Sequence, residues 1–243
     1  MGMSIWGKII GGTAGFALGG PMGALVGALV GHTYDVYAAS YAHDQQAECQ
    51  AAFSIALIAL SAKMAKADGV VTRSEILAFR EKVDIPRKDI DTVSRIWEMA
   101  RRTPDGFEGY ASQVARLFPA ASAVLEELMG LLFHIARANG RISDEGADYL
   151  RTVAAILGFD DQGYERLAAI HGDEEISPWR VLGLDPSASD DELRKAWLAL
   201  VARHHPDRLI ADGLPQECIK SANDRLARIN AAYETIRQQR KAS

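Results

Sequence analysis

The sequence predicts an all-α protein with three parts: a membrane-spanning helix, a helical bundle and a C-terminal helical hairpin. An uncharged apolar run at 9–31 is long enough to cross a bilayer. The middle of the chain shows helical periodicity with no competing strand pattern, and two apolar stripes at helical spacing follow near the C-terminus. We place the three parts at 1–44, 45–172 and 177–243.

The composition is that of an ordinary globular protein, with 48% apolar and 24% charged residues. The net charge of −5 is uneven, because residues 177–243 hold 11 Lys/Arg against 9 Asp/Glu while the rest is acidic. This asymmetry fits a basic docking surface but is too weak to indicate a nucleic-acid partner. Cys49 and Cys218 form no CxxC pattern, so we expect two free thiols, no metal site and no cofactor.

The apolar run carries a ladder of glycines at a strict spacing of four. Its 23 residues would extend about 34 Å as a helix. A strip without side chains lets two helices approach closely in lipid, so we expect a span that contacts lipid and forms a homodimer. The ladder consists of Gly7, Gly11, Gly15, Gly19, Gly23, Gly27 and Gly31.

Two other interpretations of this run stay open. The small residues of "YAASYA" at 37–42 could form the cleavage site of a signal peptide. Pro21 near the midpoint suggests a kink and also permits a re-entrant hairpin, although each arm would be too short to span. In water each glycine would cost a helix about 1 kcal/mol relative to alanine, which favours the membrane.

The middle of the chain contains two similar turns, each between two helices. In the first, Asp68–Gly69 ends a long apolar helix, and Thr72 with Glu75 forms a capping box for the next. The second turn, "RANGRIS", follows 71 residues later with Asn139 in place of the aspartate and Ser143 in place of the cap. Further helices are predicted at 86–102, 105–117, 120–138 and 159–171.

On these paired turns the middle resembles the TerB-like (tellurite-resistance) helical fold over about 120 residues. A metal role for the polar residues of the turns is conceivable, but the loops lack the alternating ligands of a calcium loop. We therefore expect helix capping from these residues, and His134 is expected to lie in or beside the core. The polar residues in question are Asp68, Glu75, Asn139, Asp144 and Glu145.

The C-terminal part predicts an antiparallel hairpin of two helices that follow a short one at Trp179–Leu182. Ser189 caps the first long helix, and Pro206 must end it near His204 because proline lacks an N–H and restricts the residue before it. Two apolar stripes then face each other and leave residues 205–207 on a turn at the tip of the connecting loop. The stripes are Leu193, Trp197, Leu200, Val201 and His204, and Ala222, Leu226, Ile229, Tyr233 and Ile236.

The segments "WRVLGL", "ELRKAW", "HHPDR" and "RINAAYE" stand in this order within 177–243 and closely resemble the J domain of DnaJ-type co-chaperones. The resemblance implies docking on a DnaK-type chaperone and acceleration of its ATP hydrolysis. His205, Pro206 and Asp207 would form the activating loop, with Asp207 offering a charge to an arginine of the partner. A basic face would comprise Arg194, Lys195, Arg203 and Arg208; it is thinner than usual, because Leu198 and Ala199 stand where basic residues are frequent.

The order of all three parts, with "WGKIIG" at 6–11 and "HHPDRLIADGLPQE" at 204–217, resembles the DjlA type of membrane-anchored, DnaJ-like co-chaperone. The resemblance implies a protein that is not an enzyme and that recruits the chaperone to the bacterial inner membrane. Because ATP and the chaperone are in the cytoplasm, we expect a single span that leaves both helical domains there. Only "HGDEEIS" separates the two helical domains, which predicts close coupling between them.

Three features leave alternatives open. His204, His205 and Asp207 could serve a metal-dependent hydrolase, although proline separates the histidine from the aspartate. The chain could also be a membrane scaffold whose J-like module no longer activates a chaperone. Finally, Lys8 before the span would by charge alone place the N-terminus inside and the J-like module outside, but the partner requirement favours the cytoplasm.

Overall fold

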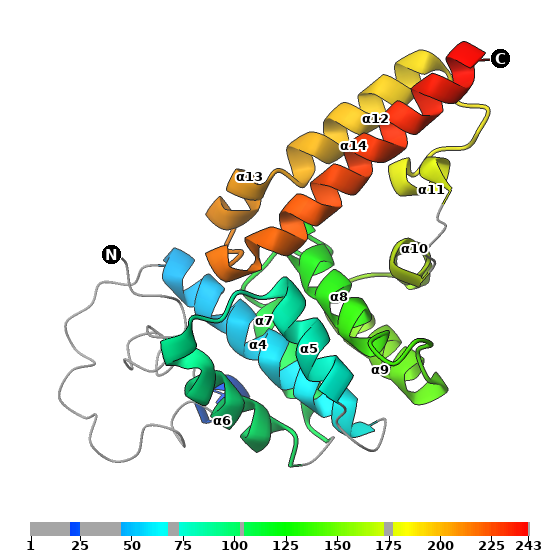
Figure 1. Ribbon diagram of the computed structural model, residues 1–243. Coiled ribbons are helices and arrows are strands. Elements are labelled where there is room, and N and C mark those ends of the chain that lie inside the picture. Colours follow the sequence, from blue (N-terminus) through cyan, green and yellow to red (C-terminus); the bar gives the residue numbers. More distant parts are fainter. Residues whose placement is uncertain (1–19, 25–44, 68–72, 103–104, 173–176, 243) are drawn as a thin grey trace.

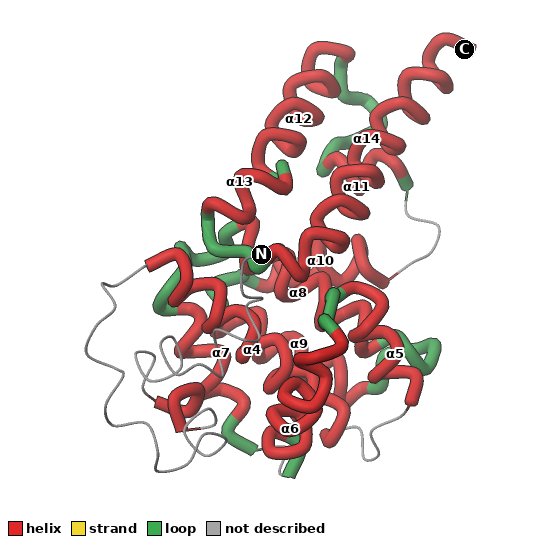
Figure 2. Tube along the Cα trace, turned by 60° about the vertical axis from the view of Figure 1, so that its left-hand side comes forward, coloured by secondary structure: helices red, strands yellow, loops and turns green. Residues whose placement is uncertain are grey.

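All regular structure in the described residues is helical, as predicted. The computed structural model describes residues 20–24, 45–67, 73–102, 105–172 and 177–242. A helical bundle forms one body, and a long helical hairpin projects from one end of it (Figure 1). The hairpin stands on the bundle in a second view as well (Figure 2).

The bundle contains α4 to α10, and the hairpin contains α11 to α14 with its connecting segment. The bundle elements are α4 (Gln45–Ala67), α5 (Arg73–Lys82), η2 (Arg87–Asp89), α6 (Ile90–Ala100), α7 (Phe107–Ala115), α8 (Ala123–Ala136), α9 (Asp144–Ile156) and α10 (Asp161–Gly172). The hairpin elements are α11 (Pro178–Leu182), α12 (Asp190–Arg203), α13 (Pro206–Ala211), η3 (Gln216–Cys218) and α14 (Ile219–Ala242).

Helix α4 is the central helix of the bundle. It packs against α6, α7, α8 and α9, and every residue from 51 to 65 is buried. Among the described helices, only its stretch Gln46–Lys66 is long and apolar enough to cross a membrane, but 83% of that window is buried by protein. Its apolar side chains are therefore accounted for by the core of the bundle.

The second of the two similar turns behaves as a helix start. Ser143 Oγ accepts a hydrogen bond from the N–H of Gly146 at 2.9 Å and so caps α9. The first turn, with Asp68 and Thr72, lies outside the described residues. Glu75, however, is buried and its Oε1 accepts a hydrogen bond from Asn139 Nδ2 at 3.3 Å, so the two copies contact each other.

Most of the predicted membrane span lies outside the described residues, including every glycine of the ladder except Gly23. Residues 20–24 form a short helix that packs against α7. Met22 is fully buried there, and its N–H donates to Gln113 Oε1 at 3.1 Å. A side chain in this core cannot face lipid, so the observed packing and a bilayer-spanning helix are alternative placements of residues 20–24.

The hairpin has a small core of its own at the end remote from the bundle. Leu193 of α12 packs with Ile229 and Ile236 of α14. The ring of Trp197 stacks on Tyr233 with centroids 4.4 Å apart, and its Nε1 donates to Asn230 Oδ1. The two predicted stripes thus face each other from Leu193 to Val201 and from Ile229 to Ile236, and α12 and α14 lie side by side in Figures 1 and 2. At the bundle end of the stripes, His204 and Ala222 pack against the bundle instead.

Candidate docking site

The end of α12 is set by the sequence His204–His205–Pro206. Helix α12 ends at Arg203, and His204 is its C-cap, as Pro206 predicted. The prediction of a turn at 205–207 needs correction, because Pro206 begins a new short helix, α13. Proline is favoured at this first position, since its missing N–H would have no intrahelical partner there.

His205 is the N-cap of α13. Its Nδ1 accepts a hydrogen bond from the N–H of Asp207 at 3.3 Å. The histidine side chain is 50% exposed and that of Asp207 is 88% exposed, whereas Pro206 is buried. The segment 205–207, which we call the HPD segment, therefore presents one imidazole and one carboxylate to solvent on a buried proline.

The predicted basic face is divided in the structure. Arg194 and Lys195 are exposed on α12, and Arg208 is exposed beside Asp212 on α13. Arg203 instead turns toward the bundle, where its guanidinium donates to Glu126 Oε1 at 2.7 Å and to the carbonyl of Ala121 at 3.0 Å. The exposed face of α12 is correspondingly less basic than the sequence suggested.

Apolar surface occupies part of the same exposed face. Leu198 is 48% exposed, and Ala199 beside it is exposed too. A partner that docks along this face would bury the leucine side chain between Lys195 and the HPD segment.

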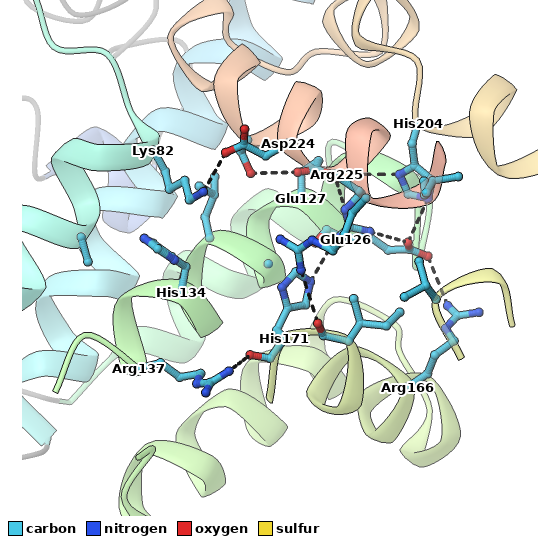
Figure 3. Close-up of a pocket in the computed structure, with 18 of the residues that line it drawn as sticks. Lys82, Glu126, Glu127, His134, Arg137, Arg166, His171, His204, Asp224 and Arg225 are labelled. Carbon is cyan, nitrogen blue, oxygen red and sulfur yellow. Dashed lines mark hydrogen bonds and ion pairs between the residues drawn. The ribbon is translucent and has the colours of Figure 1, made fainter. Parts of the chain in front are cut away.

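Two adjacent carboxylates of α8, Glu126 and Glu127, contact the end of the hairpin that lies on the bundle (Figure 3). Glu126 lies within 3.2 Å of guanidinium nitrogens of both Arg166 and Arg225, in addition to Arg203. Glu127 is almost fully buried and contacts Arg225 Nε at 2.6 Å, while Ser221 Oγ donates to it at 3.1 Å. Charged groups from both domains thus neutralise each other inside the contact.

His204 completes this cluster from the hairpin side. Its Nε2 lies 3.4 Å from Glu126 Oε2, and the ring is buried. Burial, with smaller effects of Arg225, Arg203 and Arg166, lowers the pKa of His204 to about 3. The ring is therefore neutral at pH 7 and contributes a hydrogen-bonding group rather than a charge.

His171 lies at the same interface. Its Nε2 is 3.1 Å from Arg225 Nη2, and its carbonyl accepts a hydrogen bond from Arg137. Burial, followed by the positive charge of Arg225, holds the pKa of His171 well below its usual range. A cavity of about 1380 Å³ opens between the two domains beside these groups, and Figure 3 shows the charged side chains that line it.

His134 lies on the flank of α8, with its Nε2 3.4 Å from Glu81 Oε2. Burial lowers the pKa of His134. Of the three residues that a hydrolase would use, His205 and Asp207 lie close together at the surface, with His205 Nδ1 3.9 Å from Asp207 Oδ2, whereas His204 faces Glu126 of α8.

The carboxylates Glu126 and Glu127 and their partner Arg225 were not predicted as functional residues. A signal was present in the sequence, since "AVLEELMGLLFHIA" places two adjacent acids in a strongly apolar helix. Charged residues are rarely buried unless they are paired, so such a pair indicates a partner from elsewhere in the chain.

Three family models match the chain, one after another. They are described as the co-chaperone DjlA transmembrane domain at residues 3–49, tellurite resistance protein TerB at 54–169 and the DnaJ domain at 177–243. The first match includes the whole apolar run, and the third includes the HPD segment.

Curated proteins that resemble the chain carry the name co-chaperone protein DjlA. That of Photobacterium profundum is 28% identical, with 97% of this chain and 99% of the relative covered. Those of Coxiella burnetii and Legionella pneumophila are 27% and 26% identical and are covered to 97% and 94% of their length. No solved structure matches the chain significantly. In the order of its domains and over nearly its whole length, the chain is therefore similar to the DjlA co-chaperones, which combine a transmembrane segment, a TerB-like domain and a DnaJ domain.

Proposed function

We propose that this chain stimulates the ATPase of a DnaK-type chaperone by docking its J domain, and that it recruits the chaperone to the bacterial inner membrane. One observation carries the proposal: His205 and Asp207 are offered to solvent while His204 and Pro206, which alternate with them, are buried. Because its buried neighbours fix the conformation of this segment, it can dock on a partner without a change of conformation. This reduces the entropic cost of binding.

The residues of the HPD segment would act by shape and charge. His205 Nδ1 is occupied by the N–H of Asp207, so the imidazole serves as a cap of α13 rather than as a base. The exposed carboxylate of Asp207 can pair with an arginine of the partner. Lys195 and Arg194 would steer the encounter, and Leu198 would contribute apolar contact.

The test is steady-state ATPase stimulation by the full chain and by its His205→Gln and Asp207→Asn variants. We expect both variants to lose stimulation and to keep the helical circular dichroism of the parent, because neither side chain belongs to a core. A folded His205→Gln protein with full stimulation would contradict the mechanism. An inactive parent protein would favour the scaffold alternative.

Charge reversal separates steering from activation. Lys195→Glu should raise the concentration needed for half-maximal stimulation and make it less sensitive to salt, because outward-facing charges act mainly on association. Lys88→Glu is a matched control, since Lys88 is exposed on η2 of the bundle. Equal effects of the two substitutions would show that net charge alone is responsible.

The anchor is proposed to be one transmembrane helix with both helical domains in the cytoplasm, where ATP and the chaperone are found. A reporter that is active only in the cytoplasm should therefore be active when it is fused to the C-terminus. Association in a bilayer should weaken in the Gly19→Leu/Gly23→Leu double variant, because leucines would separate the closely packed helices. Unchanged association would exclude the glycine ladder as the dimer interface.

A further inference from the structure

The segment that follows the HPD segment is buried in the bundle rather than in the hairpin. Leu209 of α13, Leu214, Cys218 of η3 and Ala222 of α14 belong to the same continuous core as α4 and α8. Each is at most 1% exposed.

The backbone of this segment is also fixed. Gly213 has φ of +108°, and a Cβ there would lie 2.9 Å from Cys49 Cβ and 2.9 Å from Phe118 Cε1. The N–H of Asp84 donates to the carbonyl of Glu217 at 2.9 Å. The close packing at Gly213 and this backbone hydrogen bond describe a tightly packed contact between the two domains.

The residues before the HPD segment are fixed by the same domain. Arg203 and His204 both contact Glu126 of α8. Arg225, nearly two turns into α14, contacts both Glu126 and Glu127 and so ties the other helix of the hairpin to the same point.

The HPD segment therefore lies between two anchors on one body. His204 immediately before it is held by α8, and Leu209 two residues after it is held in the core. Nothing in the hairpin's own core reaches this point, because the remote cluster contains no described residue between 202 and 228.

We infer that the TerB-like domain is the platform that orients the HPD segment, and that Glu126 is a positioning residue for chaperone activation. Glu126 does not touch the partner; it sets the direction of the last turn of α12 through Arg203 and His204. This inference rests on the proposed function. It also gives Arg203 a different role from the one that the family resemblance implied, since its guanidinium is bonded to Glu126 and to the carbonyl of Ala121 although the side chain is 43% exposed.

The first test compares Glu126→Gln with Glu165→Gln in the full chain reconstituted in nanodiscs. Glu165 is an exposed carboxylate of the same domain that pairs with Arg151, so it is a matched control. Misplacement of a functional group by about 1 Å can cost as much as a hundredfold in rate, and we expect roughly tenfold lower maximal stimulation for Glu126→Gln alone. Glu126→Asp should restore part of it.

Hydrogen exchange supplies a readout that needs no chaperone. In Glu126→Gln, amides of 203–212 should exchange faster while those of 51–65 in α4 keep their protection. A role confined to general stability would instead raise exchange in both segments. Unchanged exchange at 203–212 in a folded variant would overturn the inference, even if the parent protein proved unable to stimulate an ATPase.

A double-mutant cycle decides the role of Arg203. If Arg203 acts through Glu126, Arg203→Gln and Glu126→Gln lower maximal stimulation, and the double variant is no worse than the poorer single one. If Arg203 contacts the chaperone directly, Glu126→Gln leaves stimulation unchanged or raises it, and the inference is wrong. If the parent protein does not stimulate the ATPase at all, the proposed function is contradicted, whereas the effect of Glu126 on residues 203–212 is still decided by hydrogen exchange.

Discussion

The two ends of the hairpin are held in different ways. The end remote from the bundle folds on itself, with a small core around Leu193 and Ile236 and many neighbours that are only partly buried. The end near the bundle has no separate core and is completed by α4 and α8. The hairpin thus has an independent end, which is remote from the bundle, and a dependent end, whose geometry is set by contact with the bundle.

The dependent end is the one that carries the HPD segment. It also contains the buried charges, where Arg225 bridges Glu126 and Glu127. A different arrangement of the two domains would leave these buried charges without partners, so this contact favours one arrangement. A J domain built in this way is oriented by the domain that precedes it in the chain.

Truncating one leucine at each end should separate the two modes most clearly. Leu209→Ala and Leu193→Ala remove equally buried side chains, and each should cost about 2–5 kcal/mol. Only Leu209→Ala should increase hydrogen exchange in α4, because only that leucine shares its core. If Leu193→Ala had the same effect on α4, the two ends would not be independent.

Two glycines give a second matched pair. Gly183 and Gly213 both have positive φ, so alanine at either should cost about 1–2 kcal/mol in backbone strain. A Cβ at Gly183 meets nothing within 4 Å, whereas one at Gly213 meets Cys49 and Phe118, and overpacking adds about 1–3 kcal/mol. The melting temperature of Gly213→Ala should therefore be lower than that of Gly183→Ala. Equal melting temperatures would mean that the bundle adjusts to the extra methyl group.

The buried histidine of the dependent end predicts a response to acid. The pKa of His204 is lowered to about 3 by burial and nearby arginines, so only the unfolded chain binds this proton between that value and the usual one near 6.5. The contribution of His204 to the free energy of unfolding is therefore fully present above about pH 6.5. Below that pH it falls by about 1.4 kcal/mol for each unit by which the pH decreases.

The measurement is the free energy of unfolding between pH 7 and 5, where His204→Gln should show a shallower decline than the parent. His171→Gln is an informative comparison, because the pKa of His171 is lowered in the same direction at the same interface. An identical pH dependence in His204→Gln and the parent would exclude this histidine as the cause.

The independent end was largely predictable from the sequence. Periodicity located both stripes, Ser189 marked the start of α12, and Pro206 marked its end, because each depends on residues close together in the chain. The dependent end was not predictable in the same way. Arg225 and Glu126 are 99 residues apart, and only the packing of α14 on α8 brings them together.

The same limit explains the interpretation of Arg203. The resemblance to J domains implied that Arg203 belongs to an outward basic face, and only the structure of the neighbouring domain shows that its guanidinium pairs with Glu126. The predicted turn at 205–207 was also too simple, since a proline that ends one helix is well suited to begin the next.

Helix caps provide the smallest test of the comparison. Ser189 and Glu192 form a reciprocal capping box at the remote end of α12, and the hydrogen bonds from the backbone N–H and the hydroxyl of Ser189 lower the pKa of Glu192. Ser143 caps α9 in the bundle, where its hydroxyl accepts a hydrogen bond from the N–H of Gly146. Alanine at either serine should cost about 1 kcal/mol.

The distribution of that loss distinguishes the two regions. Ser189→Ala should increase exchange only in the first turns of α12, because the remote end of the hairpin unfolds locally without disturbing the bundle. Ser143→Ala should lower the stability of the bundle and, with it, loosen the HPD segment that rests on the bundle. Native-state hydrogen exchange of both variants measures this directly. If Ser143→Ala left residues 203–212 fully protected while destabilising α9, the bundle would not be the support on which the HPD segment depends.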